Sequence, residues 1–167
     1  MTVGFQNGVF KDPKQPGFLF YLDANTAQNL TGDGTSYQLG TDPLTQIYQV
    51  GSGMTTAGVF TASDTGLYVF QVSFWLANLD IGHTQGRGFI NNDSILGNFN
   101  TFHCNPFTSS TTGQNQFVSS VITPMTAGKH VNFSFIVSGG TKTVGLGGGF
   151  GSGILTYVSG YLLTKTA

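Results

Sequence analysis

Three histidines and one cysteine are the strongest candidate metal ligands of this 167-residue sequence, and they stand at His83, His103, His130 and Cys104. No His-x-His or Cys-x-x-Cys pair occurs among them, although zinc ligands are usually spaced in such ways. His103 and Cys104 would point to opposite faces of a strand, so they are poorly placed to bind the same ion. We therefore expect no metal and no cofactor. The alternative is a ring of one histidine per subunit in a symmetric assembly, which would be three-fold in the homotrimer that a family resemblance described below implies.

Groups for acid–base chemistry are also sparse. The chain contains no Glu, and its seven acidic residues are all Asp, most of them in turn-like contexts, where Asp is favoured. Asn91, Asn92 and Asp93 could bind calcium through their oxygen atoms, but a turn between strands is the preferred interpretation. The glycines of 145–153 match no nucleotide-binding pattern, and no Gly-x-Ser-x-Gly motif occurs. We predict no catalytic residue and no enzyme.

The composition predicts a single all-β domain without a charged binding surface. Charged residues make up 8% of the chain, and its formal net charge is −1, so the basic surface of a nucleic-acid-binding protein is missing. The chain has 25 Gly and 15 Phe but few helix formers, which excludes a helical bundle. One cysteine allows no internal disulfide. No run approaches the ~20 apolar residues of a transmembrane helix, and residues 1–16 lack the apolar segment of a signal peptide.

Short β-prone runs separated by Gly, Asn, Asp and Thr fill the chain from Phe18 onward. We interpret residues 1–17 as an N-terminal arm and 18–167 as one domain. The runs predict strands over 18–24, 35–39, 45–50, 58–62, 66–78, 85–91, 94–102, 115–124, 129–138, 141–146 and 154–164.

The pattern of apolar residues within these runs is more informative than their number. The run 129–138 alternates apolar and polar residues, which is typical of a strand with one face in water. The runs 66–78, 18–22 and 154–163 carry apolar residues on both faces. A two-layer sandwich buries only one face of each sheet, and no helix is expected to cover the other. We therefore expect other copies of the chain to cover it. The residues expected in the core or between subunits are Phe18, Phe20, Tyr68, Phe70, Phe74, Trp75, Tyr157, Tyr161 and Leu163.

Three segments resemble the complement C1q and tumour-necrosis-factor superfamily. The segment 60–70 contains Phe60, then five residues, then Gly66-x-Tyr68-x-Phe70, which is similar to the family signature. Residues 159–163 resemble the closing strand, and 127–131 stand where the family has a turn into a strand. The resemblance covers about residues 18–164. It implies a ten-stranded antiparallel jelly roll that assembles as a homotrimer, with the inner sheet at the three-fold axis.

A narrower resemblance points to viruses. The segments 21–25 and 30–37 are similar to the opening of C1q-like domains in structural proteins of bacteriophages and other viruses. Loops on a rigid scaffold commonly carry binding specificity, and the expected loops 80–87 and 103–116 combine polar and aromatic side chains. Their possible binding residues are His83, Arg87, His103 and Phe107.

These observations predict a non-enzymatic, trimeric protein on the surface of a virion, that of a bacteriophage. Its role would be capsid decoration, a fibre head or a tail tip that attaches to the host. The arm would contact other virion proteins, and a host surface glycan or protein is a possible partner. The alternative is an exported bacterial C1q-like adhesin or lectin-like binding module.

Overall fold

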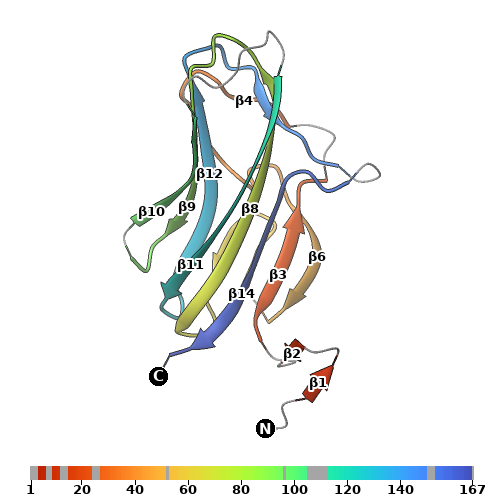
Figure 1. Ribbon diagram of the computed structural model, residues 1–167, viewed down its shortest axis with the longest axis vertical. Helices are drawn as coiled ribbons and strands as arrows, with labels where there is room; N and C mark the ends of the chain where they lie inside the picture. Colours follow the sequence, from red (N-terminus) through yellow and green to blue (C-terminus); the bar gives the residue numbers. More distant parts are fainter. Residues whose placement is uncertain are drawn as a thin grey trace.

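The fold is built from β-strands that pair in antiparallel order. The computed structural model describes two sheets that face each other and a separate two-stranded hairpin near the N-terminus (Figure 1). Among the described residues, no helix has the length and apolar character that crossing a membrane requires. The structure describes residues 4–6, 9–11, 15–23, 27–51, 53–95, 97–104, 113–149 and 153–166.

The larger sheet is organised around its longest strand, β8 (Gly66–Leu79). One edge of β8 pairs with β14 over most of its length and with β13 near its end, and the other edge pairs with β11. The remaining strands extend the sheet outward from β13 and β14. Besides β8, the sheet contains β4 (Ala27–Thr31), β13 (Val144–Leu146), β14 (Tyr157–Lys165), β3 (Gly17–Tyr21), β6 (Thr45–Val50) and β11 (Gly113–Met125).

The smaller sheet is organised around β12 (His130–Ser138). One edge of β12 pairs with β9, which pairs in turn with β10. The other edge pairs with two short strands, β7 at its start and β5 further along. Their bounds are β9 (Gln85–Asn92), β10 (Gly97–Cys104), β7 (Val59–Thr61) and β5 (Ser36–Gln38).

The core lies between the inner faces of β8 and β12. Five alternate residues of β8 have no exposed surface, and they face the buried residues of β12. Aromatic rings join the two sheets: the ring centroids of Phe70 and Phe133 lie 6.2 Å apart, and those of Phe74 and Phe135 lie 5.3 Å apart. In β12, His130 is exposed whereas Val131 is buried, which confirms the alternation predicted for 129–138.

All eleven predicted runs contain a strand, and the expected all-β jelly roll is confirmed. The two sheets together hold twelve strands in the described part of the chain. Within these two sheets the sequence analysis missed one strand, β4, which pairs with β13, and it also did not predict the hairpin in the arm. Apolar and polar residues do not alternate along β4, and Asn29 within it has a positive φ of 54°. The strand therefore depends on its pairing with β13 and has no local sequence pattern that would predict it. The sandwich thus has two strands more than the ten that the family resemblance implies.

The predicted arm contains the hairpin of β1 (Gly4–Gln6) and β2 (Val9–Lys11). This hairpin lies beyond the end of the sandwich at which β3 starts and β14 ends (Figure 1). The base of the arm is tied to β14, because Leu162 N donates a hydrogen bond of 2.9 Å to Pro16 O and Gln15 Nε2 donates to Leu162 O. The turn between β8 and β9 lies at the opposite end of the sandwich.

Two glycines of the family-like segments leave room for neighbouring groups, Gly160 for core rings and Gly66 for the backbone of β14. A Cβ atom at Gly160 would lie 2.8 Å from ring carbons of both Phe18 and Phe70, which is too close for carbon atoms. A Cβ atom at Gly66 would overlap the carbonyl oxygen of Thr164. Both positions therefore require glycine because of space.

The exchange Gly160→Ala tests this close packing. It should lower the free energy of unfolding by about 1–3 kcal/mol, since an added methyl group in a packed core forces neighbouring rings to move. Urea unfolding at fixed protein concentration measures the change. Gly97→Ala in β10 is the matched control, because its Cβ would have no heavy atom closer than 3.7 Å. Equal stability of the two variants would contradict the packing of Gly160.

Candidate functional site

The family-like signature forms the aromatic centre of the core. Phe60 stacks on Phe18 with ring centroids 5.1 Å apart. It also makes edge contacts with Tyr68 at 5.5 Å and with Phe70 at 5.3 Å. Aromatic pairs in such arrangements add to the stabilisation that burial alone gives. The aromatic residues of the signature therefore position the strands.

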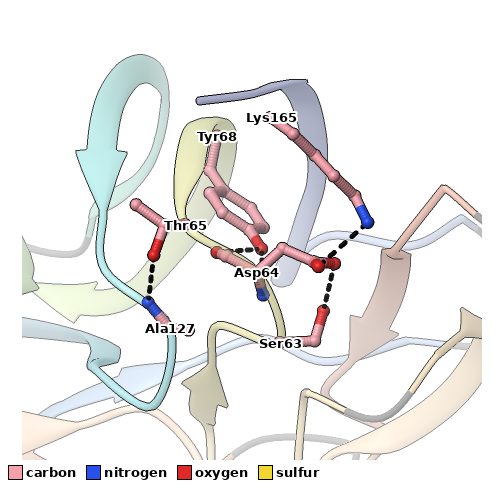
Figure 2. A network of polar contacts seen from close by, with 6 residues as sticks. All are labelled: Ser63, Asp64, Thr65, Tyr68, Ala127 and Lys165. Carbon is pink, nitrogen blue, oxygen red and sulfur yellow. Dashed lines mark hydrogen bonds and ion pairs between the residues drawn. The ribbon is translucent and has the colours of Figure 1, made fainter. Parts of the chain in front are cut away.

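The hydroxyl group of Tyr68 fixes the turn that precedes β8 (Figure 2). It donates a hydrogen bond of 2.9 Å to Asp64 O and accepts one of 3.3 Å from Asp64 N. Lys165 Nζ lies 2.9 Å from Asp64 Oδ1, and Thr65 Oγ1 accepts a hydrogen bond of 3.1 Å from Ala127 N. The turn is thereby tied to the end of β14 and to the β11–β12 turn. This network supports the fold.

The outer face of the larger sheet, which points away from the core, is largely apolar. The register places Ile122 of β11, Val69 of β8 and Tyr161 of β14 in one cross-strand row. Ile122 is 59% exposed and Tyr161 46% exposed in the single chain. Other apolar side chains on β6, β11 and β14 are exposed to a similar degree: Tyr48, Val118 and Leu163. We call these five exposed side chains and Val69 the apolar face.

One polar row interrupts the apolar face. Ser120 of β11, Gln71 of β8 and Ser159 of β14 pair across the three strands. The run 66–78 was expected to be apolar on both sides, but the outward side of β8 carries Gln71 and Ser73 beside its apolar residues. Ser73 is buried, and its hydroxyl donates a hydrogen bond of 2.7 Å to Leu155 O.

The structure divides the predicted packing residues into three groups. Phe18, Phe20, Tyr68, Phe70 and Phe74 are buried in the core, with at most 3% of their surface exposed. Trp75 and Tyr157 are half-buried. Tyr161 and Leu163 are exposed on the apolar face. The sequence could not separate these groups, because alternation alone does not say which side of a strand faces the second sheet.

The outer face of the smaller sheet is polar instead. A cross-strand row runs from Asn98 of β10 through Asn91 of β9 and Asn132 of β12 to Val59 of β7. Asn91 Nδ2 donates a hydrogen bond of 2.6 Å to Asn132 Oδ1 and one of 3.0 Å to Ser134 Oγ. The sequence analysis missed this row, because only the register brings the three asparagines together.

A pocket of about 540 Å³ opens at this row, and we call it the amide pocket. Asp93 and His130 lie at its end, where Asp93 Oδ1 accepts a hydrogen bond of 2.6 Å from His130 N. His130 Nδ1 lies 2.9 Å from Thr61 Oγ1. The described residues that line the pocket are Val59, Asn91, Asn92, Asp93, Gly97, Asn98, His130 and Asn132.

The calcium site considered for Asn91, Asn92 and Asp93 does not form. Asn92 is 2% exposed, and its side chain points away from that of Asn91. Its Nδ2 donates a hydrogen bond of 2.8 Å to Thr123 Oγ1, and its Oδ1 accepts one of 2.8 Å from Ser94 N. The three side chains therefore do not converge on one point. Within the described residues, no group of three or more His, Cys, Asp or Glu side chains could hold a metal ion.

The possible binding residues of the expected loops are placed differently from one another. His83 is fully buried; Asp80 N donates a hydrogen bond of 3.0 Å to its Nδ1, and its Nε2 lies 3.0 Å from Thr141 O. Its ring therefore organises a turn and is not available to a ligand. Arg87 and His103 are exposed but lie opposite each other on β9 and β10, not in loops, because the hairpin ladder extends to residue 104. Phe107 lies outside the described residues.

Solved structures confirm the C1q/TNF-like jelly-roll fold. Eiger TNF from S. frugiperda has a TM-score of 0.58 at 12% identity, covering 92% of this chain and 96% of that one. Vertex protein P5 of phage PRD1 has a TM-score of 0.57 at 11% identity, covering 89% and 97%. The globular domain of zebrafish complement 1qA has a TM-score of 0.53 at 14% identity, covering 90% and 99%. No protein-family model and no curated protein matches the sequence.

The ion pair between Asp64 and Lys165 gives a pH dependence. The hydrogen bond from the Lys165 ammonium group is the main reason why the pKa of Asp64 lies below its ordinary value of 3.8. Because the pKa is lower in the folded state, this contribution to stability is complete above the unfolded pKa and is lost as pH falls through the folded pKa. The effect is small, because the lysine is largely exposed.

We therefore expect Asp64→Asn to narrow the stability difference between pH 7 and pH 3. Thermal unfolding of the wild type and the variant at both pH values measures this difference. Asp33→Asn is a useful comparison, because the pKa of Asp33 is also lowered, but mainly by its hydrogen bonds with Thr35. An unchanged pH dependence in Asp64→Asn would contradict the role of the ion pair.

Proposed function

We propose that this chain forms a homotrimer on the surface of a virion, where it has a structural or host-attachment role without enzymatic activity. The observation that carries the proposal is the apolar face, which the single chain leaves open to water. Leaving a few hundred Å² of apolar surface wet forgoes several kcal/mol, at ~25 cal/mol per Å². A closed symmetric assembly of identical chains can bury such a face on every copy.

The sequence resemblance favours three copies. The C1q and tumour-necrosis-factor superfamily implies homotrimers whose inner sheet meets at the three-fold axis, and the apolar face lies on the corresponding sheet of this chain. The polar row of Gln71, Ser120 and Ser159 would then cross the contact region. In such an assembly it would fix the register between subunits, since buried polar groups must find partners.

Two observations support a place on a virus particle. The fold is shared with a phage vertex protein, and segments 21–25 and 30–37 resemble C1q-like domains of viral structural proteins. The hairpin of β1 and β2 pairs within itself and lies beyond the end of the sandwich (Figure 1). This position supports a role of the arm in contacts with other virion proteins, with the sandwich pointing away from the particle.

The second candidate is an exported bacterial C1q-like adhesin or lectin-like head. The amide pocket favours a binding role, and such a role is compatible with either setting. Neighbouring genes separate the two: capsid and tail genes would favour the virion protein, whereas secretion genes would favour the adhesin.

The assembly is tested by the exchange Ile122→Arg. The wild-type protein should have three times the chain mass of 17.7 kDa in light scattering. Arg at this exposed position should be tolerated in one chain but not in a subunit contact, since a buried unpaired charge is costly. The variant should therefore be a folded monomer. Asn100→Arg, an exposed position on the smaller sheet, should remain trimeric. A monomeric wild type, or a trimeric Ile122→Arg, would contradict the proposed interface.

The location is tested on purified particles of the virus whose genome encodes the chain. Mass spectrometry should detect the chain in the particles, and imaging should place its density on their surface. The absence of the chain from the particles would refute the virion role but would not bear on the homotrimer, which light scattering tests.

A further inference from the structure

The amide pocket keeps several polar groups available to a ligand. Asn91 Nδ2 is occupied by its bonds to Asn132 and Ser134, but within the described part of the chain Asn91 Oδ1 and Asn132 Nδ2 have no hydrogen-bond partner. The same holds for Asp93 Oδ2 and for the amide group of Asn98. None of these atoms is buried without a partner, so all of them face water in the single chain.

The bond between Asn91 and Asn132 orients these groups in advance. Because Asn132 Oδ1 accepts from Asn91 at 2.6 Å, the amide nitrogen of Asn132 is left as a free donor. In the same way, Asn91 Oδ1 is left as a free acceptor in the neighbouring strand. A fixed arrangement of this kind lowers the entropy that binding costs.

Alternating donors and acceptors match neighbouring hydroxyl groups, because each hydroxyl both donates and accepts a hydrogen bond. The described lining contains one carboxylate, that of Asp93, and neither Lys nor Arg, so it does not favour an anionic ligand. Val59 supplies an apolar wall for the C–H surface of a ring. A volume of about 540 Å³ lies within the usual range for small-ligand sites.

We propose that the amide pocket binds a neutral saccharide through neighbouring hydroxyl groups, with Asn91, Asn98, Asn132 and Asp93 as its polar contacts. The pocket lies on the outer face of the smaller sheet, whereas the apolar face lies on the larger one, so subunit assembly leaves the pocket open. Saccharide binding here would supply the ligand class for the proposed host-attachment role, and its biological meaning rests on that proposed role.

The exchange Asn132→Asp tests the proposal with little change of shape. The new carboxylate still accepts the hydrogen bond from Asn91, but the free donor at Nδ2 becomes an acceptor. The wild-type protein should bind at least one neutral saccharide on an array that carries glucose, galactose, mannose and N-acetylglucosamine as mono- and disaccharides. Titration of that saccharide should show binding about ten-fold weaker, or weaker still, in the variant.

Asn100→Asp is the matched control. It makes the same chemical change on the same face of β10, two residues from Asn98 and outside the pocket lining, so it should bind as the wild type does. Sialyllactose and sulfated galactose on the same array test charged ligands, which should not bind better than their neutral counterparts. Binding should also persist in EDTA, because no calcium ion is part of the contact.

Four results would overturn the proposal: no neutral saccharide bound at millimolar concentration, equal affinity of Asn132→Asp and wild type, binding of charged saccharides alone, or binding abolished by EDTA. Light scattering of the same sample and mass spectrometry of the particles separate this failure from failure of the proposed function. A trimer found in the particles that binds no saccharide would leave the virion role intact. Saccharide binding by a chain absent from the particles would support the pocket and refute the virion role.

Discussion

The packing of β8 against β12 is the constraint on which the rest of this structure depends. Aromatic rings from both strands fill the space between the sheets, and Gly160 of β14 leaves room for two core rings, those of Phe18 and Phe70. Because the inner face of each sheet forms the core, the side chains of the outer faces do not take part in core packing. The larger sheet uses its outer face for apolar side chains, and the smaller sheet uses its outer face for amides. The two outer surfaces therefore suit different kinds of contact.

Local patterns were sufficient to predict the architecture. Alternation in 129–138 correctly placed Phe133 and Phe135 inside, and the signature around Tyr68 indicated the jelly roll that the solved structures share. The same reasoning failed for β4, because its only regular feature is its pairing with β13. It also placed Arg87 and His103 in loops, since it did not show how far the β9–β10 ladder continues.

The candidate site was harder to predict than the fold. Asn91, Asn98 and Asn132 are up to 41 residues apart, and they become neighbours only through the register of three strands. The sequence offered Asn91, Asn92 and Asp93 as a group because they are consecutive, but consecutive residues of a strand point to opposite faces. His83 shows the same limit: a polar residue beside a turn can be a buried organiser of that turn or an exposed ligand, and only its hydrogen bonds decide.

The arm and the end of β14 lie at one end of the sandwich, and the β8–β9 turn lies at the other (Figure 1). The 14 residues of β8 separate the two ends by roughly 45 Å, at about 3.3 Å per residue. A tensile force applied between the arm and the far turn would run parallel to β8, β11 and β14. Such a force shears many hydrogen bonds at once instead of unzipping them in sequence, so this geometry is suited to mechanical resistance.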